Sequence, residues 1–453
     1  MFSTPFRSSA AALDAVQRHA VPLARSADHD SALVDLLAGA RFALLGEASH
    51  GSDDFYRERA AITRRLIVER GLDAVAVEAD WPDAYRVDRY VRGLGDDASG
   101  AEALADFKRF PAWMWRNDVV LEFVEWLREH NAERAPEARV GFYGLDLYSL
   151  FTSIEAVLAH LDRTDAEAAR RARDRYACFE RFSGDSQAYG YAARFALDAS
   201  CEEAVVAQLR EMVARAGAFS RGLADGDADA SFHAEQNARL VKNAEEYYRS
   251  MFSSRVSSWN LRDRHMAETL AELDGHLSRR RVRPARIAVW AHNSHLGDAR
   301  ATEMGESGEL NLGQLVRERH GAAAALLGFS TYQGTVTAAS DWDLPAETKQ
   351  VRPGLEGSYE KLFHGVDSAR FLLILRGNAD LAEVLAAPRL QRAIGVIYRP
   401  ETERQSHYFH ARLPRQFDAL IHLDATRALA PLDRPRDVAG PAVEPPETYP
   451  SGV

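Results

Sequence analysis

The chain has 453 residues and a formal net charge of -11 at pH 7, with 46% hydrophobic and 27% charged residues. This hydrophobic content is enough for a large folded core, and no apolar run reaches the length of a membrane span. The acidic balance disfavours a nucleic-acid-binding protein, which needs a basic face to neutralise phosphates. We therefore expect a small-molecule partner, with neither a nucleic acid nor a membrane involved.

Two features of the chain bear on its location. The first residues lack the continuous apolar segment of a secretory signal, because Asp14 and Arg18 interrupt it. The cysteines, Cys178 and Cys201, could form one bridge, but two thiols in so long a chain are more typical of a reducing cytoplasm. We therefore expect free thiols and a soluble, cytoplasmic protein.

The first 150 residues alternate between strand and helix patterns. Apolar runs of strand length lie at 41–46, 72–79 and 140–145. Helical patterns lie at 9–40, 55–70, from 81 onward and at 118–131. The second strand is nearly all apolar, as expected for a strand buried on both faces of a sheet. Gly71 follows the second helical pattern directly and is predicted to end that helix.

The strand signal disappears between 153 and 281, where Ala, Glu and Arg dominate and apolar residues recur at helical spacing. We interpret this section as a helical insertion that forms a lid or cap. Strand patterns return at 286–291, 323–329, 371–375, 395–398 and 419–423, with a helix at 312–319. Residues 331–338 predict a hairpin-type addition, because Gly334 lies between β-branched runs.

The order of these patterns predicts an α/β fold with a mainly parallel sheet, helices on both faces and a large helical insertion. Residues 1–152 and 282–430 would build the two parts of the α/β core, and 153–281 the insertion. The end of the chain, 431–453, is rich in proline and charge without apolar periodicity, which predicts a disordered tail.

Proton-carrying side chains follow the ends of four predicted strands. The first of these stretches reads LLGEASHG, and the residues concerned are Glu47, His50, Glu78, Asp146, His292 and His295. The carboxyl ends of neighbouring parallel strands meet at one edge of a sheet, which is where open α/β sheets bind their ligands. We therefore expect these side chains to gather at one rim and to form the active site.

The chemistry of this group leaves two mechanisms open. The chain has no G-x-S-x-G elbow, no P-loop, no G-x-G-x-x-G after a strand and no H-E-x-x-H. A histidine beside a carboxylate can act as a general base that deprotonates water for direct attack. Alternatively, His50, Glu78, His292 and His295 would hold a divalent metal that acidifies the water. We expect no cofactor, with this metal site as the alternative.

Four stretches together resemble the erythromycin esterase family. They are LLGEASHGSDDFYRERAAITRRLI, AVAVEADWPDAYRVDRYVRG, SSWNLRDRHMAETL and VWAHNSHLGDARATEMG, and the resemblance runs from about residue 35 to 430. It implies an α/β core with a helical portion and a deep cleft. The implied activity is hydrolysis of carboxylic esters, including the macrolactone of macrolides in antibiotic resistance members, without a serine nucleophile. Segments such as TYQGTVTAASDWD resemble the broad, non-resistance branch of the family.

The resemblance also assigns roles to residues. The family's motif positions fall on Glu47, His50, Arg59, Glu78, Arg262, His292 and His295. It implies that His50 is the general base for water and that Arg262 lies in the cleft, where it would stabilise a developing oxyanion. By composition alone, Arg59 and Arg262 would be interpreted as surface ion pairs.

Three functions follow from these patterns. The leading one is a hydrolase that cleaves a carboxylic ester or lactone with histidine-activated water. The alternative is a metal-dependent hydrolase or transferase acting on an acylated saccharide or another metabolite. A third is a binding protein with a retained cleft, but a pure binder has no need for three imidazoles at one rim.

Overall fold

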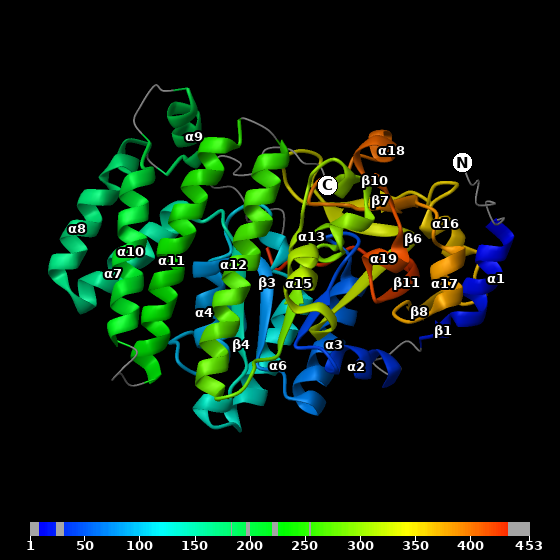
Figure 1. The fold of residues 1–453 in the computed structure, drawn as a ribbon, viewed down its shortest axis with the longest axis horizontal. Coiled ribbons are helices and arrows are strands. Elements are labelled where there is room, and N and C mark those ends of the chain that lie inside the picture. The colour runs from blue at the N-terminus through cyan, green and yellow to red at the C-terminus, as the bar shows by residue number, and fades with distance from the viewer. Residues whose placement is uncertain are drawn as a thin grey trace.

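The computed structural model describes residues 9–23, 31–182, 184–195, 200–219, 225–252 and 255–433 (Figure 1). Most of the tail predicted at 431–453 lies outside these residues. Asp433, the last described residue, forms an ion pair with Arg116 at 2.6 Å. Among the described helices, none is both long enough and apolar enough to cross a membrane.

A nine-stranded, mostly parallel sheet forms the centre of the molecule, with the order β1-β8-β11-β6-β2-β5-β3-β4 and with β7 paired to β6. Its strands are β1 Val21–Pro22, β2 Phe42–Leu45, β3 Ala74–Asp80, β4 Gly141–Asp146, β5 Ile287–Trp290, β6 Ala324–Ala338, β7 Glu347–Val351, β8 Arg370–Ile374 and β11 Ala419–Thr426. The strands from β11 to β4 pair in parallel, whereas β1, β7 and β8 pair antiparallel. A separate ribbon pairs β9 Arg389–Arg392 with β10 Tyr408–Ala411.

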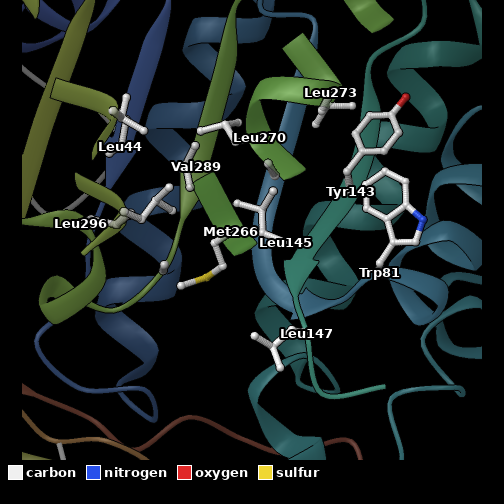
Figure 2. Packing of buried hydrophobic residues seen from close by; sticks show 14 of the residues in the cluster. Leu44, Trp81, Tyr143, Leu145, Leu147, Met266, Leu270, Leu273, Val289 and Leu296 are labelled. Carbon is white, nitrogen blue, oxygen red and sulfur yellow. The ribbon is translucent and has the colours of Figure 1, made fainter. Parts of the chain in front are cut away.

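Both faces of the central strands are buried, because side chains alternate between two hydrophobic clusters. Leu44 and Val289 join one cluster, and their neighbours Leu45 and Trp290 join the other. Figure 2 shows the first cluster, in which Met266 packs near the strand residues. The near-continuous apolar runs in the sequence follow from this two-sided burial.

Helices cover both faces of the sheet, as predicted. The face with Leu45 and Trp290 packs against α2 Ser31–Ala38, α3 Asp53–Arg70 and α6 Asp118–Ala132. The opposite face packs against α1 Ser9–His19, α12 Arg255–Arg281, α15 Leu312–His320 and α16 Tyr359–His364. Gly71 ends α3 with φ of 65°, a left-handed conformation that glycine adopts without strain.

The section between β4 and β5 contains helices and no strand among its described residues. Its α-helices are α7 Leu150–Thr164, α8 Ala166–Tyr176, α9 Ser186–Arg194, α10 Glu202–Phe219, α11 Asp225–Ser250 and α12. Helices α7 to α11 extend beyond the edge strand β4, whereas α12 lies along the sheet (Figure 1). The role of this section as a lid stays a prediction.

The remaining α-helices are short or lie at the sheet edges. They are α4 Trp81–Val91, α5 Gly100–Ala103, α13 Asn293–Leu296, α14 Glu303–Glu306, α17 Ala379–Val384, α18 Glu403–Ser406 and α19 Leu413–Gln416. Of these, α4 and α13 bear on function, because each begins directly after a strand that carries candidate residues. Pro82 occupies an early position of α4, where its missing N–H costs no hydrogen bond.

Two sequence-based expectations are wrong, and a third needs its turn moved. Cys178 and Cys201 are joined in a disulfide with Cα atoms 6.0 Å apart, a separation that suits a bridge, so they are not free thiols. Because disulfides occur mainly in oxidising compartments, the cytoplasmic location stays a prediction. Residues 395–398 form no strand. The hairpin-type addition at 331–338 is present, because Gly334 to Ala338 pair antiparallel with β7. Its turn does not lie at Gly334, since β6 continues through this residue to Ala338 and passes close to Thr426 of β11.

Candidate active site

The candidate residues converge because β2, β5, β3 and β4 are parallel neighbours in that order. Leu45 and Val77 both pair in register with Trp290, so these three strands end at the same level. The side chains that follow them therefore meet at one rim, as predicted. All of them are at most 6% exposed.

Glu47 connects His50 to Arg59 on the β2 side of the rim. Its Oε1 lies 2.9 Å from Nδ1 of His50, and its Oε2 accepts a hydrogen bond from Nη2 of Arg59 at 2.6 Å. A carboxylate that accepts a hydrogen bond from Nδ1–H of a neutral imidazole holds the hydrogen on Nδ1 and leaves Nε2 with a free lone pair. Within the described ranges, Nε2 of His50 makes no hydrogen bond.

Arg59 is fully buried on α3, and aromatic rings surround its charge. Its guanidinium lies 4.4 Å from the ring centroid of Tyr56 and 5.3 Å from that of Trp290. These cation–π contacts and the ion pair to Glu47 compensate for burying the cation. Burial and the nearby Glu47 raise the pKa of Tyr56 well above its ordinary value, so its hydroxyl stays protonated.

His292 lies beside His50, with ring centroids 4.8 Å apart. It caps the N-terminus of α13, where its Nδ1 accepts the backbone N–H of Ser294 and lies 2.8 Å from the Ser294 hydroxyl. The hydrogen of the neutral ring is therefore on Nε2. Burial and the neighbouring His50 lower the pKa of His292 well below its ordinary value, so this imidazole is neutral.

Glu78 and Asp146 share Arg262, which α12 delivers to the rim. Nη2 of Arg262 donates to Glu78 and to Asp146, both at 2.7 Å, and its Nε donates to Asp146 at 3.0 Å. The other oxygen of Glu78 accepts the backbone N–H of His292 at 2.9 Å. Burial alone would raise the pKa of Glu78, but His295 and Arg262 hold it well below the ordinary value.

His295 is held between two carboxylates. Both oxygens of Asp263 lie 3.0 Å from its Nδ1, and Oε1 of Glu78 lies 3.3 Å from its Nε2. Burial alone would lower its pKa, but Asp263 and Glu78 raise the pKa of His295 to about 9. Trp259 stacks on the ring at a centroid distance of 4.5 Å. His295 is therefore a fixed cation at neutral pH, unlike His292.

The four side chains of the alternative metal site do not fit a metal ion. Both oxygens of Glu78 accept hydrogen bonds, and Nδ1 of His295 is hydrogen-bonded to Asp263. Arg262 lies 3.2 Å from Nε2 of His295, and its charge repels a divalent cation. In the part of the chain that the structure describes, no three His, Cys, Asp or Glu side chains are grouped to hold a metal.

Two residues of the site were not predicted from the sequence. Asp263, the neighbour of Arg262 on α12, was not among the predicted residues, yet it reaches His295. It follows Arg262 directly within SSWNLRDRH, which is the signal that points to it. Trp259 lies in the same motif and supports the same ring. The pairings depend on how α12 lies against α13, which no local pattern shows.

The fold and the rim define a class of protein: an α/β enzyme with a histidine–carboxylate–arginine chain at the carboxyl ends of its parallel strands. A family model described as Erythromycin esterase matches residues 67–426, and the chain belongs to this family. That match includes Glu78, Arg262, His292 and His295, whereas Glu47, His50 and Arg59 precede it. At family level the activity is that of an ester hydrolase.

Known relatives are distant in sequence and close in fold. Erythromycin esterase type II of Escherichia coli is 21% identical over 414 residues, which cover 86% of this chain and 90% of that protein. A succinoglycan biosynthesis protein has a TM-score of 0.74 at 18% identity and covers 93% of this chain and 98% of its own. A Bacillus cereus protein has a TM-score of 0.75 at 18% identity, with coverages of 94% and 100%. A mutant of the erythromycin esterase EreC in its open conformation has a TM-score of 0.63 at 17% identity, with coverages of 87% and 93%.

Proposed function

We propose that the protein hydrolyses a carboxylic ester or lactone and that His50 activates the attacking water. The observation that carries this proposal is the chain from Arg59 through Glu47 to Nδ1 of His50, with Nε2 left free at the rim. This arrangement orients the imidazole and sets its tautomer, as a general base requires.

In the proposed reaction, Nε2 of His50 takes a proton from water as the water oxygen attacks the ester carbonyl carbon. The tetrahedral intermediate then collapses, the bond to the alkoxide breaks, and His50 returns the proton to the leaving oxygen. Glu47 keeps its negative charge throughout and stabilises the imidazolium, because Arg59 holds the carboxylate in place. No covalent acyl-enzyme forms.

The other side of the rim carries fixed charges of both signs. Arg262 and His295 contribute two cations, whereas Glu78, Asp146 and Asp263 contribute three carboxylates. Two of the three nitrogens of Arg262 are used by carboxylates, so we assign the contact with the oxyanion to its Nη1.

The test is hydrolysis of a panel of p-nitrophenyl esters, small lactones and erythromycin by wild type and His50→Ala, each with and without a chelator. We expect His50→Ala to lose roughly 10²–10⁴ in rate on the best substrate. His19→Ala, which removes a histidine paired with Asp380 on the opposite edge of the sheet, is the matched control and should keep full rate.

The same assay separates this proposal from the metal-dependent alternative. Water activated by His50 predicts no loss of activity with chelator, whereas a metal-dependent hydrolase or transferase would lose activity and regain it with added metal. Chelator-sensitive activity that survives His50→Ala would overturn the proposal.

A further inference from the structure

The hairpin of β6 and β7 carries a tryptophan at its tip. The N–H of Leu344 donates to the carbonyl of Asp341 at 3.3 Å, which closes a turn with Trp342 at its second position and Asp343 at φ of 56°. Small polar residues and glycine normally occupy such positions. A half-buried indole at a turn tip therefore points to a packing or binding role.

One side of this hairpin is attached next to the general base. The N–H of Thr337 donates to the carbonyl of Gly51 at 2.9 Å, one residue after His50. Arg399 holds the tip by an ion pair to Asp341 at 2.9 Å and a hydrogen bond to the carbonyl of Ser340 at 3.0 Å. The position of the hairpin is thus set by the loop that carries His50.

The tip reaches the loop between α5 and α6, on the other side of the rim. The ring of Trp342 meets that of Phe110 edge to face, with centroids 5.7 Å apart at an angle of 68°. The neighbouring Arg109 pairs with Asp80 at 2.9 Å, two residues after Glu78. The Trp342–Phe110 contact therefore joins the His50 side of the rim to the Glu78 side.

The topology of the sheet places this contact above the site. Strands β2 and β5 lie between β6 and β3, and their carboxyl ends carry His50 and His292. The hairpin extends β6, and the loop that it touches is held at the end of β3 by Arg109, so the contact lies across the ends of β2 and β5. The rings of Trp342 and Phe110 thus cover the charged side chains of the rim, which are at most 6% exposed. We call these two rings the aromatic roof.

We propose that Trp342 and Phe110 bind the apolar group attached to the ester and select substrates by the length of that group. This inference rests on the proposed ester hydrolysis. A carbonyl that reaches His50 lies beneath the roof, so the chain next to that carbonyl must lie against the two rings. Aromatic faces offer such a chain apolar area without a hydrogen bond, and they disfavour short polar groups.

The test is calorimetric binding of methyl ketones with propyl, pentyl and heptyl chains, which keep the carbonyl but cannot be hydrolysed. In wild type we expect binding to tighten by about twofold to fourfold for each added methylene, the range of partial to full burial of a CH₂ group. Trp342→Ala should make the dissociation constant nearly independent of chain length, and Trp342→Phe should restore most of the dependence.

Leu344→Ala is the matched control, because Leu344 lies in the same turn and its side chain is 47% exposed. It should keep the wild-type dependence on chain length. The proposal is overturned if wild type shows no such dependence, or if Trp342→Ala keeps it. Ketone binding with the expected dependence, but no hydrolysis of any ester, would instead refute the proposed function. It would still support the binding of apolar chains by Trp342 and Phe110.

Discussion

Replacing Glu47 with glutamine separates the two contacts that its carboxylate makes. One oxygen orients His50 at 2.9 Å, and the other neutralises Arg59 at 2.6 Å. The amide of glutamine can present its NH₂ group to Nδ1 of His50 and thereby favour the wrong tautomer. We expect a loss of roughly 10²–10⁴ in kcat/KM, the range of general-base assistance, because the imidazole then no longer presents a free Nε2 to water.

The same substitution should also reduce stability, because Arg59 has no solvent-exposed surface. Removing one partner of a buried ion pair costs about 3–5 kcal/mol, and the rings of Tyr56 and Trp290 reduce that cost. Urea unfolding of Glu47→Gln, Arg59→Met and the double variant measures this coupling. The double variant should regain stability, because it no longer buries an unpaired arginine, but it should stay inactive.

Glu69→Gln is the matched control, because Glu69 also pairs with an arginine of α3, Arg65, but lies at the surface. It should leave both activity and stability unchanged. Full activity in Glu47→Gln, or recovery of activity in the double variant, would refute the role assigned to the Arg59–Glu47–His50 chain.

Three further outcomes are expected. The pKa of His295, about 9, lies above its unfolded value near 6.5. Its contribution to the free energy of unfolding is therefore complete below about pH 6.5 and is lost as pH rises through about 9. Urea unfolding at several pH values should show this decline, and Asp263→Asn should flatten it. Ser294→Ala should keep activity within about fivefold, because Nε2 of His292 has no partner among the described residues to orient a Ser–His pair; an acyl group found on a serine by mass spectrometry would contradict this. Gly334→Ala should lower the free energy of unfolding by at least about 1–3 kcal/mol, because φ is 132° and an added Cβ would overlap the carbonyl oxygen of Thr426; Gly357→Ala, with positive φ but open space, should cost less.

Much of the rim could be predicted because its signals are local. Each strand is an apolar run, and the residues that follow it, such as Glu47, Glu78 and His292, are adjacent in the chain. If the strands are parallel neighbours, their carboxyl ends share one edge of the sheet. The side chains that follow them were therefore expected to meet there, whatever the order of the strands. The order β2-β5-β3-β4 then confirmed that assumption.

Other features depend on contacts between distant parts of the chain. The disulfide between Cys178 and Cys201 requires two helical segments to lie side by side, and two cysteines in a sequence do not show this. The continuation of β6 through Gly334 requires β7 and β11 as partners on either side, whereas the local pattern of glycine between β-branched residues suggested a turn.

The sequence by itself therefore determined the central parallel strands and which proton-carrying side chains follow them, because apolar periodicity and glycine act over a few residues. The tertiary structure alone decided the state of each histidine. Asp263, which lies 32 residues before His295 in the chain, makes that ring a cation, while burial beside His50 keeps His292 neutral. A histidine takes its charge from the groups that surround it in space, and those groups are brought together only when α12 packs against the rim.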